Sequence, residues 1–159
     1  MNTELGLTAP MTAIVVGARG GLGAAFTRAL SSSPGVARVL ATSRDSQWCD
    51  EESAPKEVRV ALDLTDETGL MKLADHIPEE EPLQLVLNCS GLLHTDSLKP
   101  ERTWRELNID DMRRVFDVNA LGVALLVMHL VPLMPRRGRS IFATISARVG
   151  SIGDNRLGG

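Results

Sequence analysis

Residues 17–23, with the sequence Gly17-Ala18-Arg19-Gly20-Gly21-Leu22-Gly23, decide the fold. Before them, Ala13–Val16 is a β-branched run that predicts a strand, and after them Leu22–Ser33 carries apolar residues at helical spacing. Glycines between a strand and a helix permit a tight turn and let an anion approach the backbone, where the helix N-terminus favours negative charge. The pattern GxxxGxG therefore predicts the phosphate loop of a dinucleotide-binding fold, with a tight turn that binds no ligand as the alternative.

The rest of the chain alternates between strand and helix signals. The polar segment Ser43–Pro55 is ambiguous, and residues 1–10 are expected to form a disordered lead-in. Alternating strands and helices predict a parallel sheet with helices on both faces, which is a Rossmann-like α/β domain over residues 11–159. Further strands are expected at Arg38–Thr42, Val58–Leu62, Leu83–Leu87 and Ser140–Ile145, with helices from Thr65 to Pro78 and from Asn108 or Asp110 to about Met134.

Composition excludes several classes of protein. A chain of 159 residues with a net charge of −3 has no basic stripe to neutralise phosphates, so no nucleic-acid partner is expected. The apolar stretch Ala120–Met134 contains His129 and Pro132 and follows an amphipathic segment, which favours a partly buried helix over a membrane span. The two cysteines are expected to be reduced thiols in the cytoplasm, and no metal is expected.

The end of the second strand bears on which dinucleotide is bound. An acidic residue at this point favours the ribose 2′-hydroxyl of NAD, and an arginine favours the 2′-phosphate of NADP. Here Ser43 stands where the acid would lie and Arg44 follows it, while Arg19 in the glycine loop offers a second positive charge. We therefore expect NADP(H) in preference to NAD(H), although Asp45 beside Arg44 weakens the case.

Five ordered landmarks together resemble the short-chain dehydrogenase/reductase family. They are the glycine loop at 17–23, Asp63-Leu64-Thr65, Asn88-Cys89-Ser90-Gly91, Val118-Asn119-Ala120-Leu121-Gly122, and Ser146. The segment from Ser146 to Asn155 is similar to the C-factor-like branch of that family. The resemblance covers Met11–Gly159, about the first two-thirds of a typical member, and it implies five strands in the order 3-2-1-4-5, with the later strands missing.

The resemblance also implies a role for each matching residue. Gly17, Gly21, Leu22 and Gly23 would hold the pyrophosphate. Asp63 and the backbone of Leu64 would contact adenine, and Asn88 and Gly91 would lie under the nicotinamide ribose. The carbonyl of Asn119 would hold a proton-relay water, and Ser146 would bond the substrate carbonyl.

The family's Tyr-x-x-x-Lys motif, which supplies the proton and holds the nicotinamide ribose, has no counterpart here, since the sequence contains no tyrosine. We therefore expect the cofactor-binding portion of an oxidoreductase that acts on a carbonyl or alcohol, without catalytic competence as this chain. The helix at 110–134 would pair with another subunit, as in a homo-oligomer. The alternatives are a non-catalytic nucleotide-binding or signalling module and, more weakly, another Rossmann-type enzyme such as a methyltransferase.

Overall fold

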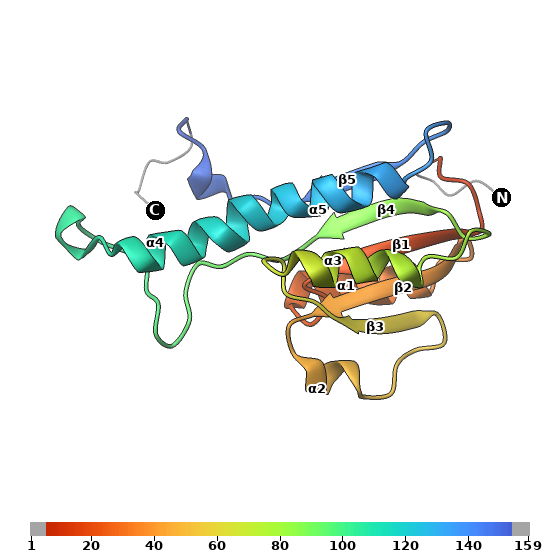
Figure 1. The fold of residues 1–159 in the computed structure, drawn as a ribbon, viewed down its shortest axis with the longest axis horizontal. Helices are drawn as coiled ribbons and strands as arrows, with labels where there is room; N and C mark the ends of the chain where they lie inside the picture. Colours follow the sequence, from red (N-terminus) through yellow and green to blue (C-terminus); the bar gives the residue numbers. More distant parts are fainter. Residues whose placement is uncertain (1–5, 154–159) are drawn as a thin grey trace.

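The computed structural model describes residues 6–153 as one five-stranded parallel sheet in the order β3-β2-β1-β4-β5, with helices on both faces (Figure 1). The predicted fold class and strand order are confirmed. The strands are β1 (Met11–Val16), β2 (Val36–Ser43), β3 (Glu57–Ala61), β4 (Leu83–Asn88) and β5 (Ile141–Thr144). The α-helices are α1 (Gly21–Ser31), α2 (Ser46–Cys49), α3 (Glu67–Leu73), α4 (Ile109–Phe116) and α5 (Gly122–Leu130).

The sheet separates two hydrophobic clusters. On one face, Ile14, Leu40 and Val86 pack with residues of α3 and α5. On the other face, Val15 and Val39 pack against Phe26 of α1. Because neighbouring residues of one strand belong to opposite clusters, the central strands are apolar on both faces, as parallel strands buried between helices require. β5 lies at the sheet edge, with Ile141 and Phe142 half-buried.

The prediction that residues 1–10 are disordered is wrong for residues 6–10, the part of this segment that the structure describes. The side chain of Leu7 is fully buried in the cluster that contains α1. Gln84 of β4 holds the backbone of Thr8 at two points, accepting from its N–H at 2.8 Å and donating to its carbonyl at 2.7 Å. Residues 1–5 and 154–159, which include the end of the C-factor-like segment, lie outside the described residues.

The long helix expected from residue 108 is a continuous helical rod from Ile109 to Leu133. Asn108 is its N-cap, since its side-chain oxygen accepts hydrogen bonds from Asp110 and Asp111. A π-helical turn at Asp117–Leu121 separates α4 from α5, and α4 projects beyond the sheet (Figure 1). By length and composition alone this helical rod could cross a membrane, and only 17% of its most apolar 18-residue stretch is buried. The expected absence of a membrane partner therefore stays a prediction.

The other boundaries agree with the sequence expectations to within two residues, except that α3 ends at Leu73 and continues as a 3₁₀ turn to His76, whereas the helix was expected to reach Pro78. The third helix begins after Asp66, whose side chain accepts from Thr68, because Thr65 is engaged with Asp63. The ambiguous segment contains the single turn α2, capped by Asp45. Short 3₁₀ turns occupy Ala74–His76, Trp104–Glu106, Val131–Leu133 and Arg148–Gly150.

Candidate functional site

The glycine loop requires glycine at two positions for different reasons. Gly17, directly after β1, has a φ of +75°, and a Cβ there would stand 3.0 Å from the backbone nitrogen of Ser90. A Cβ at Gly23 would overlap the carbonyl oxygen of Gly17 and stand 2.8 Å from its carbonyl carbon. These contacts show that the loop, the start of α1 and the segment after β4 are packed backbone against backbone.

The start of α1 is open. Its N-cap is Gly20, which provides no side-chain cap, and the first turn holds no acidic residue. A Cβ added at Gly21 would meet nothing within 4 Å, and Leu22 is 58% exposed. The first N–H groups of a helix have no intrahelical acceptor, so an 11-residue helix with this start presents donors and the positive end of its dipole to an anion.

A cleft of about 630 Å³ opens at the carboxyl ends of the strands, where ligands bind in open α/β sheets. Seven of the predicted site residues line it: Gly17, Arg19, Ser43, Arg44, Asp63, Leu64 and Gly91. Gly21, Leu22 and Gly23 follow the lining residue Gly20 at the start of α1, and Asn88 is buried beneath the lining residues Cys89 and Ser90. The sheet therefore brings together most of the residues predicted to bind the dinucleotide.

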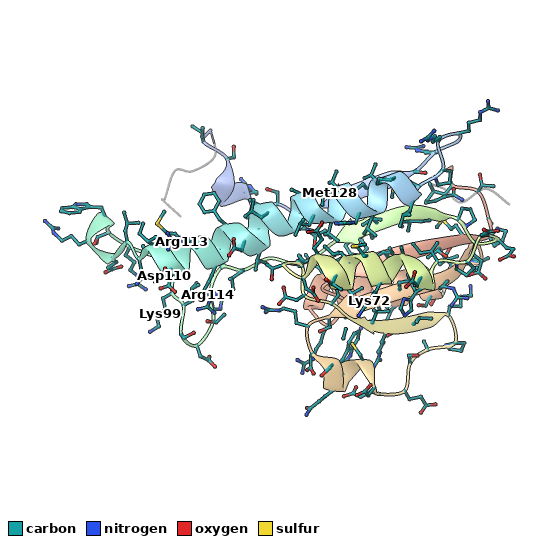
Figure 2. The ribbon with its side chains drawn as sticks, in the orientation of Figure 1. Lys72, Lys99, Asp110, Arg113, Arg114 and Met128 are labelled. Atoms are coloured by element: carbon teal, nitrogen blue, oxygen red, sulfur yellow. The ribbon has the colours of Figure 1, made fainter. Side chains whose placement is uncertain are left out.

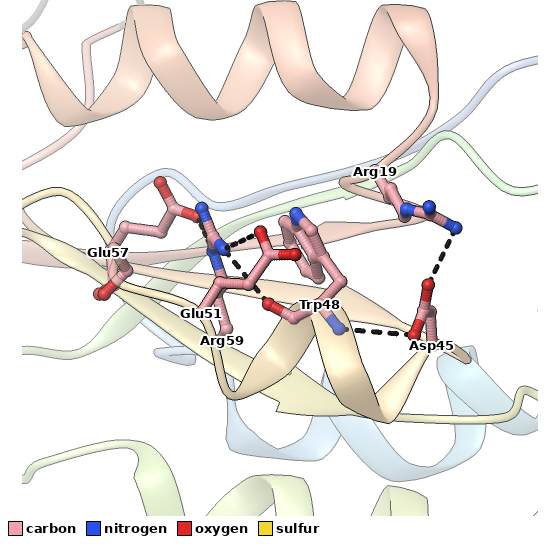
Figure 3. A network of polar contacts seen from close by, with 7 residues as sticks. Arg19, Asp45, Trp48, Glu51, Glu57 and Arg59 are labelled. Atoms are coloured by element: carbon pink, nitrogen blue, oxygen red, sulfur yellow. Dashed lines mark hydrogen bonds and ion pairs between the residues drawn. The ribbon is translucent and has the colours of Figure 1, made fainter.

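The charged wall of the cleft contains two arginines and two carboxylates (Figure 3 shows one pair). The Arg19 guanidinium lies 2.8 Å from the Asp45 carboxylate. Arg44 is exposed and makes no hydrogen bond or ion pair within residues 6–153. The backbone N–H of Thr65, with lesser contributions from its hydroxyl and from Arg44, holds the pKa of Asp63 below its usual range, against the opposing effect of partial burial. Asp63 is therefore ionised at neutral pH.

The geometry of Asp63 suits an acceptor role. Both hydrogen bonds from Thr65 fall on Oδ1, at 2.9 Å from the N–H and 2.7 Å from the hydroxyl. The other oxygen, Oδ2, has no hydrogen-bond donor in the described part of the chain. It can accept from a donor such as an exocyclic amino group in the cleft.

Asn88 ties the ends of β4 and β5 together under the cleft. Its amide nitrogen donates to the hydroxyl of Thr144 at 3.1 Å, and its amide oxygen accepts from both the N–H and the hydroxyl of Ser90. Cys89 between them is half-buried, and burial raises the pKa of its thiol, so a neutral thiol is expected at pH 7. Asn88 thus acts as a buried support for the lining residue Ser90.

Asn119 fixes the loop after β4 instead of lining the cleft. Its side chain accepts from the N–H of Leu92 and donates to the carbonyl of the same residue, both at 2.7 Å. The residue lies in the π-helical turn, a distortion that recurs at functional sites. Ser146 follows β5 at the same edge of the sheet and is exposed, but it is not among the lining residues.

Three features of the site were missed by the sequence reasoning. Leu92 lines the cleft and is held by Asn119 across 27 positions, a separation that no local pattern signals. Thr42 and Val118 also line it, from β2 and from the long helix. The sequence reasoning noted Asp45 beside Arg44, but it did not find that Asp45 caps α2 and pairs with Arg19. In the described part of the chain no group of three or more His, Cys, Asp or Glu could hold a metal ion.

The sequence profile described as short chain dehydrogenase matches residues 11–157. The chain belongs to this family. It is 27% identical to the cis-4-hydroxycyclohexanecarboxylate dehydrogenase of Sinomonas cyclohexanicum over 150 residues, which are 91% of this chain and 58% of that protein. The chain therefore spans less than two thirds of the length of this curated relative.

Solved structures described as carbonyl reductases superpose on most of the chain. The structure described as the carbonyl reductase Sniffer of Caenorhabditis elegans is 27% identical and has a TM-score of 0.80, covering 94% of this chain and 68% of that one. An NADPH-bound carbonyl reductase from chicken fatty liver is 25% identical with a TM-score of 0.73, covering 97% of this chain and 63% of that one. The chain is thus an oxidoreductase-family domain that contains the family's NAD(P)-binding region.

Proposed function

We propose that this chain is the NADP(H)-binding portion of a short-chain oxidoreductase of the C-factor-like branch, which acts on a carbonyl or alcohol substrate. The observation that carries the proposal is the uncapped start of α1, where the space around Gly21 is open beside a cleft of about 630 Å³. That space fits a pyrophosphate, because backbone donors face it and no side chain fills it. The bound cofactor would supply the hydride chemistry.

Different residues around the cleft contact different parts of the dinucleotide. Gly17, Gly21 and Gly23 shape the phosphate loop, and Leu22 contributes a backbone N–H. Asp63 accepts from adenine through its Oδ2, and Leu64 packs beside it. Gly91 and the Asn88-supported Ser90 form the floor below the nicotinamide ribose.

The two arginines support a preference for NADP(H) over NAD(H). Guanidinium groups recognise phosphate well, and Arg44 is exposed at the cleft and free of an ion pair among the residues described. The NADPH-bound relative is consistent with this preference. Arg44→Ala should therefore weaken NADPH binding by about tenfold and leave NADH binding within twofold. Arg28→Ala, at the far end of α1, is the matched control, and equal losses for both dinucleotides in Arg44→Ala would contradict the assignment.

We propose one role for each of the two catalytic candidates, Ser146 and Asn119. Ser146 would bond the substrate carbonyl, and the backbone carbonyl of Asn119 would hold a proton-relay water at the π-turn. A tyrosine is the family's proton donor, and these 159 residues contain none. General acid catalysis contributes about 10²- to 10⁴-fold, so the chain should bind cofactor with little or no turnover. NADPH oxidation by the chain at more than a hundredth of the rate of a family member that carries the tyrosine would contradict this.

A second candidate, a non-catalytic module that pairs with a related subunit, is favoured by the exposed apolar residues of the long helix. Phe116, Leu121 and Met128 are 61%, 57% and 52% exposed. Figure 2 shows Met128 on α5 and charged residues, among them Asp110, Arg113 and Arg114, on the projecting α4. We propose that this helix contacts a second copy in the cytoplasm, where the free Cys49 and Cys89 stay reduced. Analytical ultracentrifugation of the wild-type chain and Met128→Lys tests it, and two identical monomeric profiles would overturn it.

A further inference from the structure

The helical rod approaches the turn after β3 so closely that only glycine fits at the contact. A Cβ added at Gly122, the first residue of α5, would stand 2.9 Å from the Cβ of Leu64 and 3.2 Å from the carbonyl oxygen of Asp117. The Cβ of Leu64 is bonded directly to the backbone, so no rotation of its side chain relieves the first contact. The position of the rod and the position of the turn therefore depend on each other at Gly122.

This turn carries the residues that the proposed function assigns to adenine. Asp63 and Leu64 both line the cleft, and Leu64 is buried in the hydrophobic cluster that contains Leu126 of α5. Val118, four residues before Gly122 on the rod, lines the same cleft. One wall of this end of the cleft thus comes from the turn and another from the rod, and Gly122 is where the two elements meet.

A second contact holds the far end of the turn. Glu67 is the first residue of α3, and its Oε1 lies 3.0 Å from Nε2 of His129 on α5. Leu70 of α3 and Leu130 of α5 belong to one buried cluster, so the two helices also pack through their apolar side chains (Figure 1 shows both helices on the same face of the sheet). The rod therefore holds the turn at both of its ends.

The acceptor role of Asp63 is sensitive to where the turn lies. Thr65 holds Oδ1 from within the turn, so the direction of Oδ2 follows the backbone of the turn. Carbon atoms in contact lie about 3.5–4.0 Å apart, so a Cβ at Gly122 would move the turn or the rod by about 0.5–1 Å. Because hydrogen bonds weaken steeply with misalignment, such a shift affects the bond to the 6-amino group of adenine more than the contacts of the rest of the dinucleotide.

We propose that Gly122 is a positioning residue for the dinucleotide. By letting the rod meet Leu64, it sets the place of Asp63 and thereby the preference of the cleft for adenine over a purine with a 6-oxo group. This inference rests on the proposed dinucleotide-binding function and deepens it. Gly122 is not among the residues that line the cleft, so it acts through Leu64. The contact of His129 with the exposed Glu67 has the same role at the other end of the turn, with a smaller effect because exposed ion pairs are weak.

The test is an equilibrium titration of the 159-residue chain and its Gly122→Ala variant with NADPH and with reduced nicotinamide hypoxanthine dinucleotide phosphate, which has a 6-oxo group in place of the 6-amino group. The wild-type chain should bind NADPH at least about tenfold more tightly, because the Asp63 carboxylate accepts from an amino group and repels a carbonyl oxygen. In Gly122→Ala, NADPH binding should weaken by about tenfold and binding of the hypoxanthine dinucleotide by about twofold, so the ratio of the two dissociation constants falls by about fivefold. Ala124→Ser is the matched control: it adds one heavy atom to an exposed residue of the same helix and should leave this ratio unchanged.

His129→Ala gives a second, milder measurement that does not depend on whether Gly122→Ala folds. It removes the contact with Glu67 and should weaken NADPH binding by about threefold while leaving the hypoxanthine dinucleotide unchanged. Equal losses for the two dinucleotides in Gly122→Ala, or in His129→Ala if Gly122→Ala does not fold, overturn the inference and leave the proposed function standing. An unchanged NADPH dissociation constant in Gly122→Ala, an equal change of the ratio in Ala124→Ser, or equal binding of both dinucleotides by the wild-type chain does the same. If the wild-type chain binds neither dinucleotide, the proposed function fails, and the inference fails with it.

Discussion

Alanine at Gly23 and at Gly21 should have opposite effects on stability, although the two positions are only two residues apart. At Gly23, a Cβ would overlap the Gly17 carbonyl oxygen and stand 2.9 Å from the Cα of Ala18. Those atoms are backbone, so no side-chain rotation relieves the overlap. Overpacking of this kind costs about 3 kcal/mol, and the better helix propensity of alanine returns up to about 1 kcal/mol. The net loss of about 2 kcal/mol corresponds to a melting temperature lower by about 4–8 °C.

At Gly21, a Cβ would meet no atom within 4 Å, so alanine should leave the melting temperature unchanged or raise it by about 2–4 °C. The same Cβ would stand at the open start of α1, and we expect NADPH binding to weaken by at least about tenfold. Circular dichroism melting of both variants, with NADPH titration of Gly21→Ala, measures the two effects. The reasoning is refuted if Gly23→Ala is as stable as wild type, or if Gly21→Ala loses as much stability as Gly23→Ala.

Three further predictions concern single side chains. Leu7→Ala should lower the free energy of unfolding by about 3 kcal/mol because Leu7 is fully buried. Leu107→Ala is the control: this residue is 57% exposed, so the substitution should change the free energy of unfolding by less than about 0.5 kcal/mol. A loss below about 1 kcal/mol for Leu7→Ala in urea unfolding would show that Leu7 does not belong to the core. Asp63→Asn should lower the melting temperature at neutral pH. Because the pKa of Asp63 is lowered by folding, its contribution to stability is present above about pH 4 and falls as the pH drops below that value. The difference between the two melting temperatures should therefore shrink in acid, and a difference that is independent of pH would contradict the assignment. Asn119→Ala should speed hydrogen exchange at the Leu92 amide, which donates to Asn119, and an unchanged exchange rate would show that the loop is held otherwise.

The fold was predictable because its signals are local. Short apolar and β-branched runs located all five strands, and helical apolar spacing located helices between them. The landmark residues that resemble the family supplied the order of the strands. Leu7 was not predictable in this way. A single leucine before Thr8 forms no periodic pattern, and its burial depends on Gln84, which binds the Thr8 backbone from β4. Such a contact between residues far apart in sequence has no signature in either segment.

The site was predictable to the extent that topology alone places residues. Parallel strands bring their carboxyl ends to one edge of the sheet, so Gly17, Arg44 and Asp63 meet there because each follows a strand. Side-chain partners were not predictable. The sequence offered Arg19 as a second phosphate ligand and gave no means of seeing that Asp45 already holds it. Ion pairs between exposed side chains depend on angles between loops that spacing does not determine.

Titration of the purified 159-residue chain with NADPH, with intrinsic nucleotide fluorescence and protein melting recorded on the same samples, tests the central claim most directly. The account predicts saturable binding and a melting temperature that rises with ligand. At a concentration 100 times the Kd, the stabilisation should be about 2.7 kcal/mol, or about 5–11 °C. Gly21→Ala should melt at or above the wild-type temperature without ligand and show little of this rise. A folded chain whose melting temperature and fluorescence do not respond to NADPH or NADH would contradict the claim that this cleft binds a dinucleotide.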